Sequence, residues 1–382
     1  MKIFVIAGEA SGDQLGASII HELAKRHPQL NIRGIGGTHL KQAGLSESLF
    51  PMHELSIMGV AEILPHIPKI LRRITQAVTA IKLFNPDIIL TIDSPDFTFR
   101  VLEKIKNLKI KSKRIHVVAP SVWAWRAGRA EQISKFLDGL LCLLPFEPVL
   151  FEKYGLKSCF MGHPVMQSGV LTANGSAFRF SNMIGAAQPT CGLFFGSRKG
   201  ELDRHQSLFL DTAESLQKEN SDLVFIIPTL PRYKERLSAA LSERNLKSII
   251  VDDKNEKWNA IAACDIALNV SGTIGLELSV ANIPHIMAYK FHPISFAIGK
   301  MLVKTKYGHL TNILQNQPII PEFLQDQATA EAISAYLKSL FDDKELRQKQ
   351  RDAFENVRQQ LTADPQKKSA ELAADFIESF VK

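Results

Sequence analysis

The sequence begins Lys2-Ile3-Phe4-Val5-Ile6-Ala7-Gly8-Glu9-Ala10-Ser11-Gly12-Asp13, and this stretch decides the fold. Its first six residues form a short apolar run with several β-branched side chains, which is typical of a strand buried on both faces. A glycine ends the run, and residues 14–25 then show the spacing of an amphipathic helix. A strand, a glycine turn and a helix form the first part of a βαβ unit. The stretch therefore predicts an open, mostly parallel α/β sheet.

The same alternation continues along the chain in two series. We predict further strands of the first series at residues 87–92, 114–119 and 139–144. A second series is predicted at residues 191–195, 223–227, 248–251, 265–270 and 285–288. Two series of this kind predict two Rossmann-like domains that face a central cleft, with ligands at the carboxyl ends of the strands.

The periodic pattern breaks between residues 169 and 189, where Gly, Ser, Asn and Ala are frequent, and we predict a domain linker there. The expected domains are residues 1–170 and 185–345. Residues 346–382 are expected to form C-terminal helices, with Lys, Arg, Glu and Gln on their polar faces. A chain of 382 residues suits two α/β domains.

Composition and charge narrow the class of protein. The chain is 45% hydrophobic and 22% charged, as is usual for a soluble globular protein. A net charge of +7 suits an anionic partner, either a phosphorylated substrate, an acidic membrane surface or nucleic acid. The alternative is a solvated basic surface without a partner.

The cysteines and the apolar runs indicate a location. The four cysteines, none in a C-x-x-C pair, lie in or beside apolar stretches, which indicates buried free thiols in a reducing compartment. The first apolar run is too short for a signal peptide, and no run reaches the roughly 18 apolar residues of a membrane span. We expect a cytoplasmic protein that can still lie on a membrane surface.

The first glycine turn is a candidate ligand site. Gly8, Ser11 and Gly12 precede or begin a helix, so their backbone N–H groups can face a ligand at the positive end of the helix dipole. The turn lacks the G-x-G-x-x-G pattern of dinucleotide sites. The alternative is a structural turn in which Ser11 or Asp13 caps the helix.

Asp93 follows the strand that is predicted to end at Ile92, which places its carboxylate at the carboxyl edge of the first sheet. A carboxylate at that edge is a candidate general base. The alternative is that Asp93 or Asp96 caps the helix after Pro95, and for Asp96 we prefer this interpretation.

Two of the three tryptophans, Trp123 and Trp125, follow the next strand. Aromatic faces at a strand end can stack on a sugar or an acyl chain, and the alternative is that both rings pack the loop.

The second domain carries two candidate phosphate sites. Arg198 follows its first strand and can donate charge-assisted hydrogen bonds to a phosphate. Ser271, Gly272 and Thr273 follow a later strand and begin a helix, which makes a second anion site. Glu277 lies one turn further on the same helix face, where a carboxylate can hold a ribose diol. The alternatives are a surface arginine and an ordinary capped helix.

The sequence does not support a metal site or a cofactor. The 11 histidines include no H-x₃-H pair, and the single His163 is more often structural. A G-x-S-x-G nucleophile elbow is also absent from the sequence.

These motifs together resemble the lipid-A-disaccharide synthase family. The similarity rests on residues 8–13, 92–97, 119–125, 144–147 and 162–164 in the first half. It continues in residues 196–198, 271–273, 304–305, 312–314 and 321–322, with Glu277, and fades after about residue 330. The Ser-Val-Trp-Ala-Trp stretch at 121–125 is the most specific of these motifs.

The resemblance implies a GT-B fold and an inverting transfer without a metal or cofactor. The implied substrates are UDP-2,3-diacylglucosamine and 2,3-diacylglucosamine 1-phosphate, and the products are a β-1,6-linked disaccharide and UDP. The implied first domain holds the acceptor and the second the UDP-sugar. Peripheral attachment to the inner face of the inner membrane and a homodimer are also implied. In this arrangement the helices of residues 346–382 pack back on the first domain or are exchanged between the two partners.

The resemblance also implies roles for individual residues. Asp93 is the implied catalytic base, and Arg198 binds the donor diphosphate. The implied donor site further contains Ser271, Gly272, Thr273, Glu277, Asn312, Glu322 and Gln325.

Three positions depart from the family pattern. Phe195 and Thr311 stand where the family usually has Pro, and Gly275 stands where Ala is commoner. None of them is charged, so we expect the activity to survive, with altered loop stiffness near the diphosphate at Phe195 and Gly275.

Two other functions stay open on the residues alone. A UDP-sugar epimerase or another GT-B transferase shares the second-domain motifs but not residues 121–125. A catalytically inactive sugar-nucleotide sensor or membrane adaptor keeps the phosphate sites and can lose Asp93.

Residues 55–84 carry many apolar side chains with Lys69, Arg72, Arg73 and Lys82 between them. We expect this segment to border the acceptor entrance and to rest on anionic lipid. The alternative is a core-facing amphipathic helix with a basic outer face.

Overall fold

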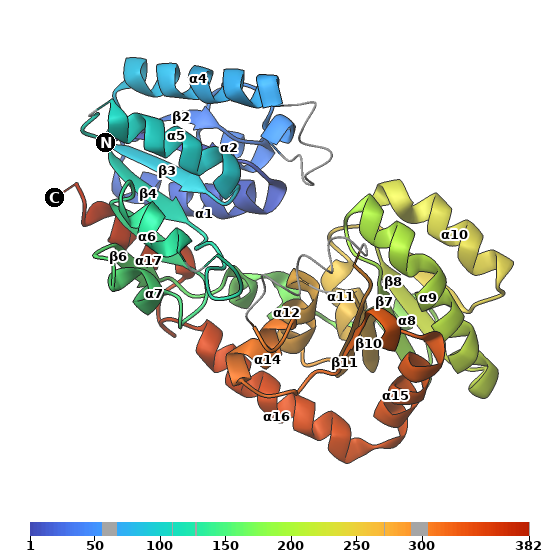
Figure 1. Ribbon diagram of the computed structural model, residues 1–382. Coiled ribbons are helices and arrows are strands. Elements are labelled where there is room, and N and C mark those ends of the chain that lie inside the picture. The colour runs from blue at the N-terminus through green and yellow to red at the C-terminus, as the bar shows by residue number, and fades with distance from the viewer. Residues whose placement is uncertain (56–66, 109, 127, 271, 292–304, 382) are drawn as a thin grey trace. The chain divides into compact units, whose positions relative to one another are not determined.

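The computed structural model describes residues 1–55, 67–108, 110–126, 128–270, 272–291 and 305–381. The chain forms two compact units. Unit 1 contains Met1–Pro164 and Leu361–Lys382, and unit 2 contains Val165–Gln360. Each unit is a parallel sheet with helices on both faces (Figure 1).

The sheet of unit 1 has six parallel strands in the order β2-β1-β3-β4-β5-β6. Their bounds are β1 Lys2–Ala7, β2 Asn31–Ile35, β3 Ile88–Ile92, β4 Lys113–Val117, β5 Gly139–Cys142 and β6 Lys157–Phe160. The helices of this unit are α1 Ala10–Arg26, α2 Thr38–Gln42, α4 Ile67–Phe84, α5 Pro95–Asn107, α6 Arg129–Ser134, α7 Pro148–Glu152 and α17 Ser369–Glu378.

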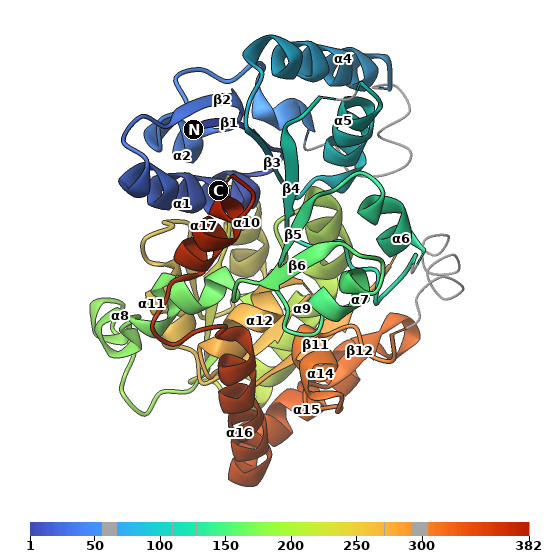
Figure 2. The same cartoon turned by 90° about the vertical axis from the view of Figure 1, so that its left-hand side faces the viewer.

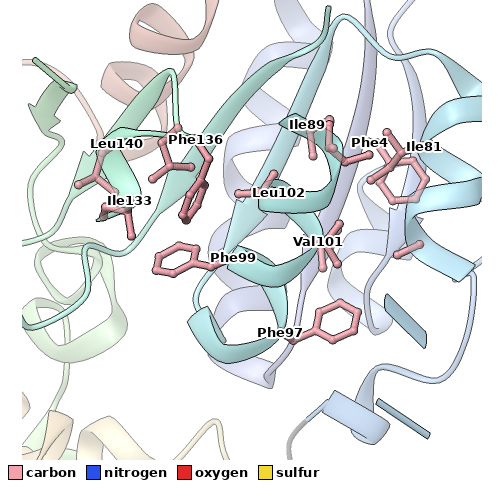
Figure 3. Packing of buried hydrophobic residues seen from close by; sticks show 14 of the residues in the cluster. Phe4, Ile81, Ile89, Phe97, Phe99, Val101, Leu102, Ile133, Phe136 and Leu140 are labelled. Atoms are coloured by element: carbon pink, nitrogen blue, oxygen red, sulfur yellow. The ribbon is translucent and has the colours of Figure 1, made fainter. Parts of the chain in front are cut away.

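Alternate residues of each strand in unit 1 enter opposite core layers. Phe4 and Ile6 pack with α4 and α5, whereas Ile3, Val5 and Ala7 pack with α1 and α17. Figure 3 shows the first layer, in which Val101 and Leu102 of α5 lie beside strand residues. Because both faces are covered, the strands are almost wholly apolar, as the sequence predicts.

The sheet of unit 2 also has six parallel strands, in the order β12-β11-β10-β7-β8-β9. Their bounds are β7 Thr190–Phe194, β8 Val224–Pro228, β9 Ser248–Val251, β10 Ile266–Asn269, β11 His285–Tyr289 and β12 Glu322–Leu324. The helices are α8 Gly175–Ser181, α9 Lys199–Glu219, α10 Lys234–Glu243, α11 Lys257–Ala262, α12 Thr273–Val280, α14 Leu310–Gln315, α15 Ala330–Asp342 and α16 Lys344–Leu361. Helices α9, α10 and α15 pack on one face, and α8, α11 and α12 on the other (Figure 2).

The nine strands predicted from the sequence are all present, within one or two residues at each end. The sequence analysis did not predict β2, β6 and β12, which are three of the four edge strands of the two sheets; the fourth edge strand, β9, was predicted. An edge strand pairs on one side only and is partly exposed, as the mixed burial of β2 and β6 shows. Its residues therefore lack the continuous apolar run by which a central strand is recognised.

The segment expected to be a linker belongs to unit 2 in the structure. Asn174 caps the start of helix α8, because its side chain accepts a hydrogen bond from Ala177 N at 2.9 Å. Phe178 is buried in the core of unit 2, and the Arg179 guanidinium pairs with Asp265 at 2.8 Å. The sequence analysis did not predict this helix, because seven residues are too few to show a clear helical periodicity of apolar side chains.

The last two helices belong to different units. Helix α16 packs in unit 2, where Phe354 is buried against Met287 and Ile320. Helix α17 packs against α1 in unit 1 and is tied to it by the ion pair of Arg26 with Asp375 at 2.7 Å. The C-terminal helices therefore do not form a separate body.

All four cysteines are free, and three of them are buried. Among the residues that the structure describes, no helix is long and apolar enough to cross a membrane. Residues 56–66 of the apolar segment predicted to rest on lipid lie outside the described residues.

Candidate active site

The β1–α1 turn of unit 1 packs against the β3–α5 turn. A Cβ atom at Gly8 would overlap the Ser94 side chain, and a Cβ atom at Gly12 would meet Ile92 at 3.4 Å. Glycine at position 8 therefore permits the close approach of the two turns, whereas the contact at position 12 is an ordinary one. Ser11 is exposed in the first turn of α1.

Asp13 does not cap its own helix, contrary to one interpretation of the sequence. Its buried carboxylate accepts hydrogen bonds from Gly37 N at 2.6 Å, His39 N at 2.9 Å and Leu40 N at 3.3 Å. These groups lie at the start of α2, so Asp13 caps that helix instead. The sequence could not show this because the partner helix begins 25 residues later.

Asp93 lies directly after β3 with a φ angle of 52°, and Ser94 follows with 47°. Left-handed backbone at two consecutive residues other than glycine is strained. Hydrogen bonds hold it: Asp93 N donates to Val117 O at 3.0 Å, and Thr98 Oγ1 donates to Asp93 O at 3.1 Å. The Asp93 carboxylate is half-buried and accepts a hydrogen bond from Ser94 N at 2.8 Å. The strained turn fixes this carboxylate at the edge of the sheet.

Asp96 does not cap α5, contrary to our interpretation of the sequence. Its side chain is 80% exposed and pairs with Arg129 at 3.2 Å, and α5 has no side-chain cap. The turn at Asp93 and Ser94 directs the first residues of α5 so that this side chain points to solvent and to Arg129.

The two tryptophans after β4 have different surroundings. Trp123 Nε1 donates to Glu147 Oε1 at 3.2 Å, and its ring meets Phe146 edge-on at 5.5 Å. Trp125 is 38% exposed, and the Arg126 guanidinium lies 4.2 Å from its ring centre. Trp123 therefore packs its loop, whereas the Trp125 ring is available for contact with a ligand.

Glu147 is a buried group that the sequence analysis did not single out for a role. Its Oε2 accepts hydrogen bonds from Leu143 N at 3.2 Å and Leu144 N at 3.0 Å, while its Oε1 accepts the Trp123 bond. Burial raises the pKa of Glu147 to about 7, although these three donors act in the opposite direction. Glu147 directly precedes the short helix α7, and nothing in the local sequence indicates that its carboxyl group is buried.

Unit 2 contains a cavity of about 380 Å³ at the carboxyl ends of β7, β8 and β9 and the start of α12. Four of the predicted donor residues line it: Arg198, Gly272, Thr273 and Glu277. Ser271, which was predicted with them, lies outside the described residues. Glycines with positive φ angles stand at both turns, Gly196 with 91° and Gly272 with 85°. Backbone N–H groups can approach a ligand closely at such turns.

The two charged residues of this cavity that the sequence predicted, Arg198 and Glu277, both have partners. Arg198 Nη1 lies 3.0 Å from Glu201 Oε1, and Glu201 Oε2 also accepts hydrogen bonds from Ser197 N and Arg198 N. Glu277, with its side chain 13% exposed, pairs with Lys257 at 2.6 Å. Lys257 also lines the cavity. The sequence analysis did not predict this, because Lys257 stands 20 residues before its partner Glu277.

The other predicted donor residues form a second group that does not line this cavity. Asn312 Nδ2 donates to Glu322 Oε1 at 2.8 Å and to Ile320 O at 2.7 Å. Glu322 also accepts from Gly308 N at 2.8 Å and from His309 N at 2.9 Å. Gln325 has a φ angle of 51° and accepts a hydrogen bond from Phe291 N at 2.6 Å. Asn312 is thus a buried structural residue that orients Glu322.

The comparisons with known proteins decide the family. The family model described as lipid-A-disaccharide synthetase matches residues 3–377. The chain is 37% identical over 381 residues to a lipid-A-disaccharide synthase of Rhodospirillum centenum, covering 99% of this chain and 95% of that protein. It is 41% identical over 340 residues to that of Rickettsia bellii, covering 89% and 88%. The chain belongs to the lipid-A-disaccharide synthase family. It is therefore a glycosyltransferase of lipid A synthesis.

Solved structures agree on the fold. The S. aureus MnaA–UDP co-structure is similar with a TM-score of 0.65 and 13% identity, covering 100% of this chain and 96% of that one. A UDP-GlcNAc 2-epimerase from Neisseria meningitidis, bound to UDP-GlcNAc, has a TM-score of 0.61 at 13% identity, covering 95% and 100%. At this identity the likeness shows the fold alone, which is GT-B.

Two of the three departures from the family pattern lie in the core near α12, and the third lies beside β7. Phe195 is buried against Phe209, with 5.3 Å between ring centres. Gly275 and Thr311 are buried together between α12 and α14. Within the described residues, no group of three His, Cys, Asp or Glu side chains is arranged to hold a metal ion.

Proposed function

We propose that the protein transfers the sugar of UDP-2,3-diacylglucosamine to the 6-hydroxyl of 2,3-diacylglucosamine 1-phosphate. The product is the β-1,6-linked disaccharide 1-phosphate, and UDP is released. Family membership supports the choice of substrates. The binding of the UDP-sugar donor is supported mainly by the cavity of unit 2. The Arg198 guanidinium, the start of α12 at Thr273 and the Glu277 carboxylate all line this cavity.

The donor nucleotide binds in that cavity in our proposal. The N-terminus of α12 at Gly272 and Thr273 and the Arg198 guanidinium offset the diphosphate charge. Glu277 accepts hydrogen bonds from the ribose hydroxyls. Glu322, held by Asn312, and Gln325 face the donor sugar once the complete substrate is bound.

Asp93 acts as the general base. The acceptor 6-hydroxyl attacks the anomeric carbon while its proton passes to the Asp93 carboxylate. The bond between the anomeric carbon and the diphosphate oxygen breaks, and UDP leaves from the opposite face, which inverts the configuration. Arg198 and α12 stabilise the charge on the leaving diphosphate, and one such donor typically contributes about 3 to 4 kcal/mol. Gly8, Ser11, Gly12 and Trp125 contribute the acceptor side. Trp123 acts indirectly, because it packs the loop that carries Trp125.

A direct assay tests the reaction. The purified protein is incubated with both substrates, and the products are identified by mass spectrometry. Disaccharide 1-phosphate and UDP in equal amounts are the expected result. Isomerised UDP-sugar without disaccharide would instead support an epimerase. Binding of UDP without any product would support a sugar-nucleotide sensor.

We also propose that the protein works at the inner face of the inner membrane. Helix α4 supports this with three apolar side chains that are exposed, Ile67, Leu71 and Leu83, the last to 82%. Arg72 is also exposed, whereas Arg73 is held by Glu54 at 2.7 Å and over the Phe50 ring. Arg73 is therefore unsuitable as a probe, because its loss would disturb the fold.

Flotation with anionic vesicles tests the membrane proposal. Leu71→Ser combined with Arg72→Glu is expected to reduce the bound fraction at least threefold, because both apolar burial and attraction to lipid are lost. Lys104→Glu on the exposed face of α5 is the charge control. Equal binding of the double variant and the control would refute the proposal for this helix. The proposed homodimer is tested separately by light scattering.

A further inference from the structure

A buried polar network connects α12 with α14 in unit 2, and it contains two of the positions that depart from the family pattern. Ser279 Oγ donates to Gly275 O at 3.1 Å and lies 2.6 Å from Thr311 Oγ1. Ser279 and Thr311 have no exposed surface. Gly275 and Thr311, 36 residues apart in the sequence, therefore belong to one cluster.

His309 fills the space that a side chain at position 275 would need. A Cβ atom built on Gly275 would overlap His309 Nε2 and would lie 3.0 Å from Asn269 Nδ2. Gly275 lies inside a helix, where alanine is favoured over glycine by about 1 kcal/mol. The glycine is thus explained by the imidazole ring and not by a need for backbone freedom.

The hydrogen bonds of His309 fix its tautomer. Thr311 N donates to His309 Nδ1 at 3.2 Å, so the proton of the neutral ring is on Nε2. Nε2 then donates to His285 Nε2 at 3.1 Å, and His285 Nδ1 donates to Ile283 O at 2.7 Å. Burial lowers the pKa of His285 to about 4, and burial together with His285 holds the pKa of His309 well below its usual range. Both rings are therefore neutral at pH 7.

The same segment holds Glu322. The backbone N–H groups of Gly308 and His309 donate to its carboxylate at 2.8 and 2.9 Å. The imidazole of His309 is directed instead to α12 and β11. Residue 309 therefore contacts the Glu322 carboxylate through its backbone and the donor-cavity helix through its side chain.

Two faces of helix α12 make different contacts. Thr273 and Glu277, four residues apart, face the donor cavity. Gly275 and Ser279, also four residues apart, face the buried network. A displacement of the network thus changes the distance between the nucleotide-binding face of α12 and Glu322.

We propose that His309 is a positioning residue that sets the place of Glu322 relative to α12, and that Gly275 is the site into which it fits. This proposal rests on the proposed function, because it assigns Glu322 to the donor sugar and α12 to the nucleotide. The role of His309 is then to align the sugar with the nucleotide of the same donor molecule.

The test is a double-mutant cycle of Gly275→Ala and His309→Asn. Asparagine keeps an oxygen that can accept the Thr311 N–H bond at the start of α14, but it is too short to reach Gly275 and His285. Gly185→Ala is the matched control, because a Cβ atom there meets only ordinary contacts, the nearest at 3.6 Å. UDP affinity, donor KM and kcat are measured below the unfolding temperature of each variant.

The expected results separate positioning from folding. Gly275→Ala should lower kcat/KM for the donor about tenfold or more, although alanine is the better helix former. His309→Asn should lower it similarly while the Kd for UDP, which lacks the sugar, changes less than about threefold. When His309→Asn is already present, adding Gly275→Ala should lower kcat/KM by less than about threefold, because the imidazole that the alanine would overlap has been removed. The control should match the native protein.

Two outcomes overturn the proposal. Effects of the two substitutions that simply multiply would show that His309 and Gly275 act independently. Equal losses of UDP affinity and of kcat/KM in His309→Asn would show a merely structural role. An inactive native protein would instead refute the proposed function, and the thermal unfolding of the four proteins would still report whether the two residues are coupled.

Discussion

The turns after two strands of unit 1, β3 and β4, differ from the turns after two strands of unit 2, β7 and β10. In unit 1, Asp93 after β3 and Val118 after β4 have positive φ angles of 52° and 78°. In unit 2, the residues with positive φ angles after β7 and β10 are Gly196 and Gly272. Glycine adopts this backbone without strain, and it leaves room for a ligand beside the N–H groups. Aspartate adopts it at a cost, so its presence suggests that the side chain itself is needed.

The partners of the charged side chains also differ between the two units. Arg198 and Glu277 in unit 2 each lie within 3.0 Å of an oppositely charged side chain. The Asp93 carboxylate in unit 1 accepts a hydrogen bond from the next backbone N–H. The comparison suggests that unit 2 is organised for binding an anionic nucleotide and that the edge of unit 1 is organised for chemistry. The following five predictions test this distinction.

Asp93→Asn should have the largest effect. Asparagine tolerates a positive φ angle, so the turn should persist, but it cannot accept the acceptor proton. We expect kcat to fall by about 10² to 10⁴ and the Kd for UDP to stay within about twofold. Turnover and calorimetric titration with UDP measure the two quantities. Near-native turnover would place the base elsewhere, and loss of UDP binding would make Asp93 a structural or donor residue.

Arg198→Ala should reduce both binding and turnover. A hydrogen bond to a charged group is worth about 1.5 to 3 kcal/mol, so the Kd for UDP should rise roughly ten- to hundredfold. Lys199→Ala is the matched control, because Lys199 is 81% exposed and pairs with Asp203 at 3.0 Å. Lys199 does not line the cavity. Equal effects of the two substitutions would mean that only net charge matters.

Lys257→Gln should have a moderate effect through Glu277. Without the ammonium group at 2.6 Å, the partly buried carboxylate loses its partner and its fixed orientation. We expect the Kd for UDP to rise about three- to tenfold. Lys254→Gln, a lysine on the same cavity, measures the effect of charge alone and should change the Kd less. In a double-mutant cycle with Glu277→Gln, the losses of UDP-binding free energy caused by the two substitutions should not add.

Glu147→Gln should alter the pH dependence of stability in unit 1. Because the folded state raises the pKa of Glu147 to about 7 from 4.5, its protonated form stabilises the fold below pH 4.5. That contribution is lost as the pH rises toward about 7. Glutamine cannot titrate, so the stability of the native protein relative to the variant should fall over this range, by up to about 3 kcal/mol.

Denaturant unfolding followed by tryptophan fluorescence measures this difference. A Trp258→Phe background removes the one tryptophan of unit 2 and leaves Trp123 and Trp125 to report on unit 1. A difference between the two proteins that is constant from pH 4.5 to 8 would show that Glu147 does not titrate in this range.

The smallest effect is expected from excess EDTA, which should leave the turnover unchanged. Arg198 and the start of α12 can offset the diphosphate charge without a divalent ion. Turnover with and without EDTA, and then with added Mg²⁺, is the measurement. Loss of activity that one divalent ion restores would overturn the proposed mode of diphosphate binding.

The sequence alone determined the parallel sheets, the positions of the central strands and the turns that carry the candidate groups. Buried central strands are apolar runs, and glycine turns before helices are local patterns, so both can be recognised in a short window. The motifs around Asp93, Trp123 and Arg198 were sufficient to identify the family.

Only the tertiary structure decided which groups are partners. Glu147 meets Trp123 from 24 residues away, Lys257 meets Glu277 from 20, and His309 occupies the space beside Gly275 from 34. Three of the four edge strands, and the division of α16 and α17 between the units, were likewise decided only by the tertiary structure. These pairings depend on how helices and loops pack on the finished sheets, and packing across such separations leaves no period or local motif in the sequence.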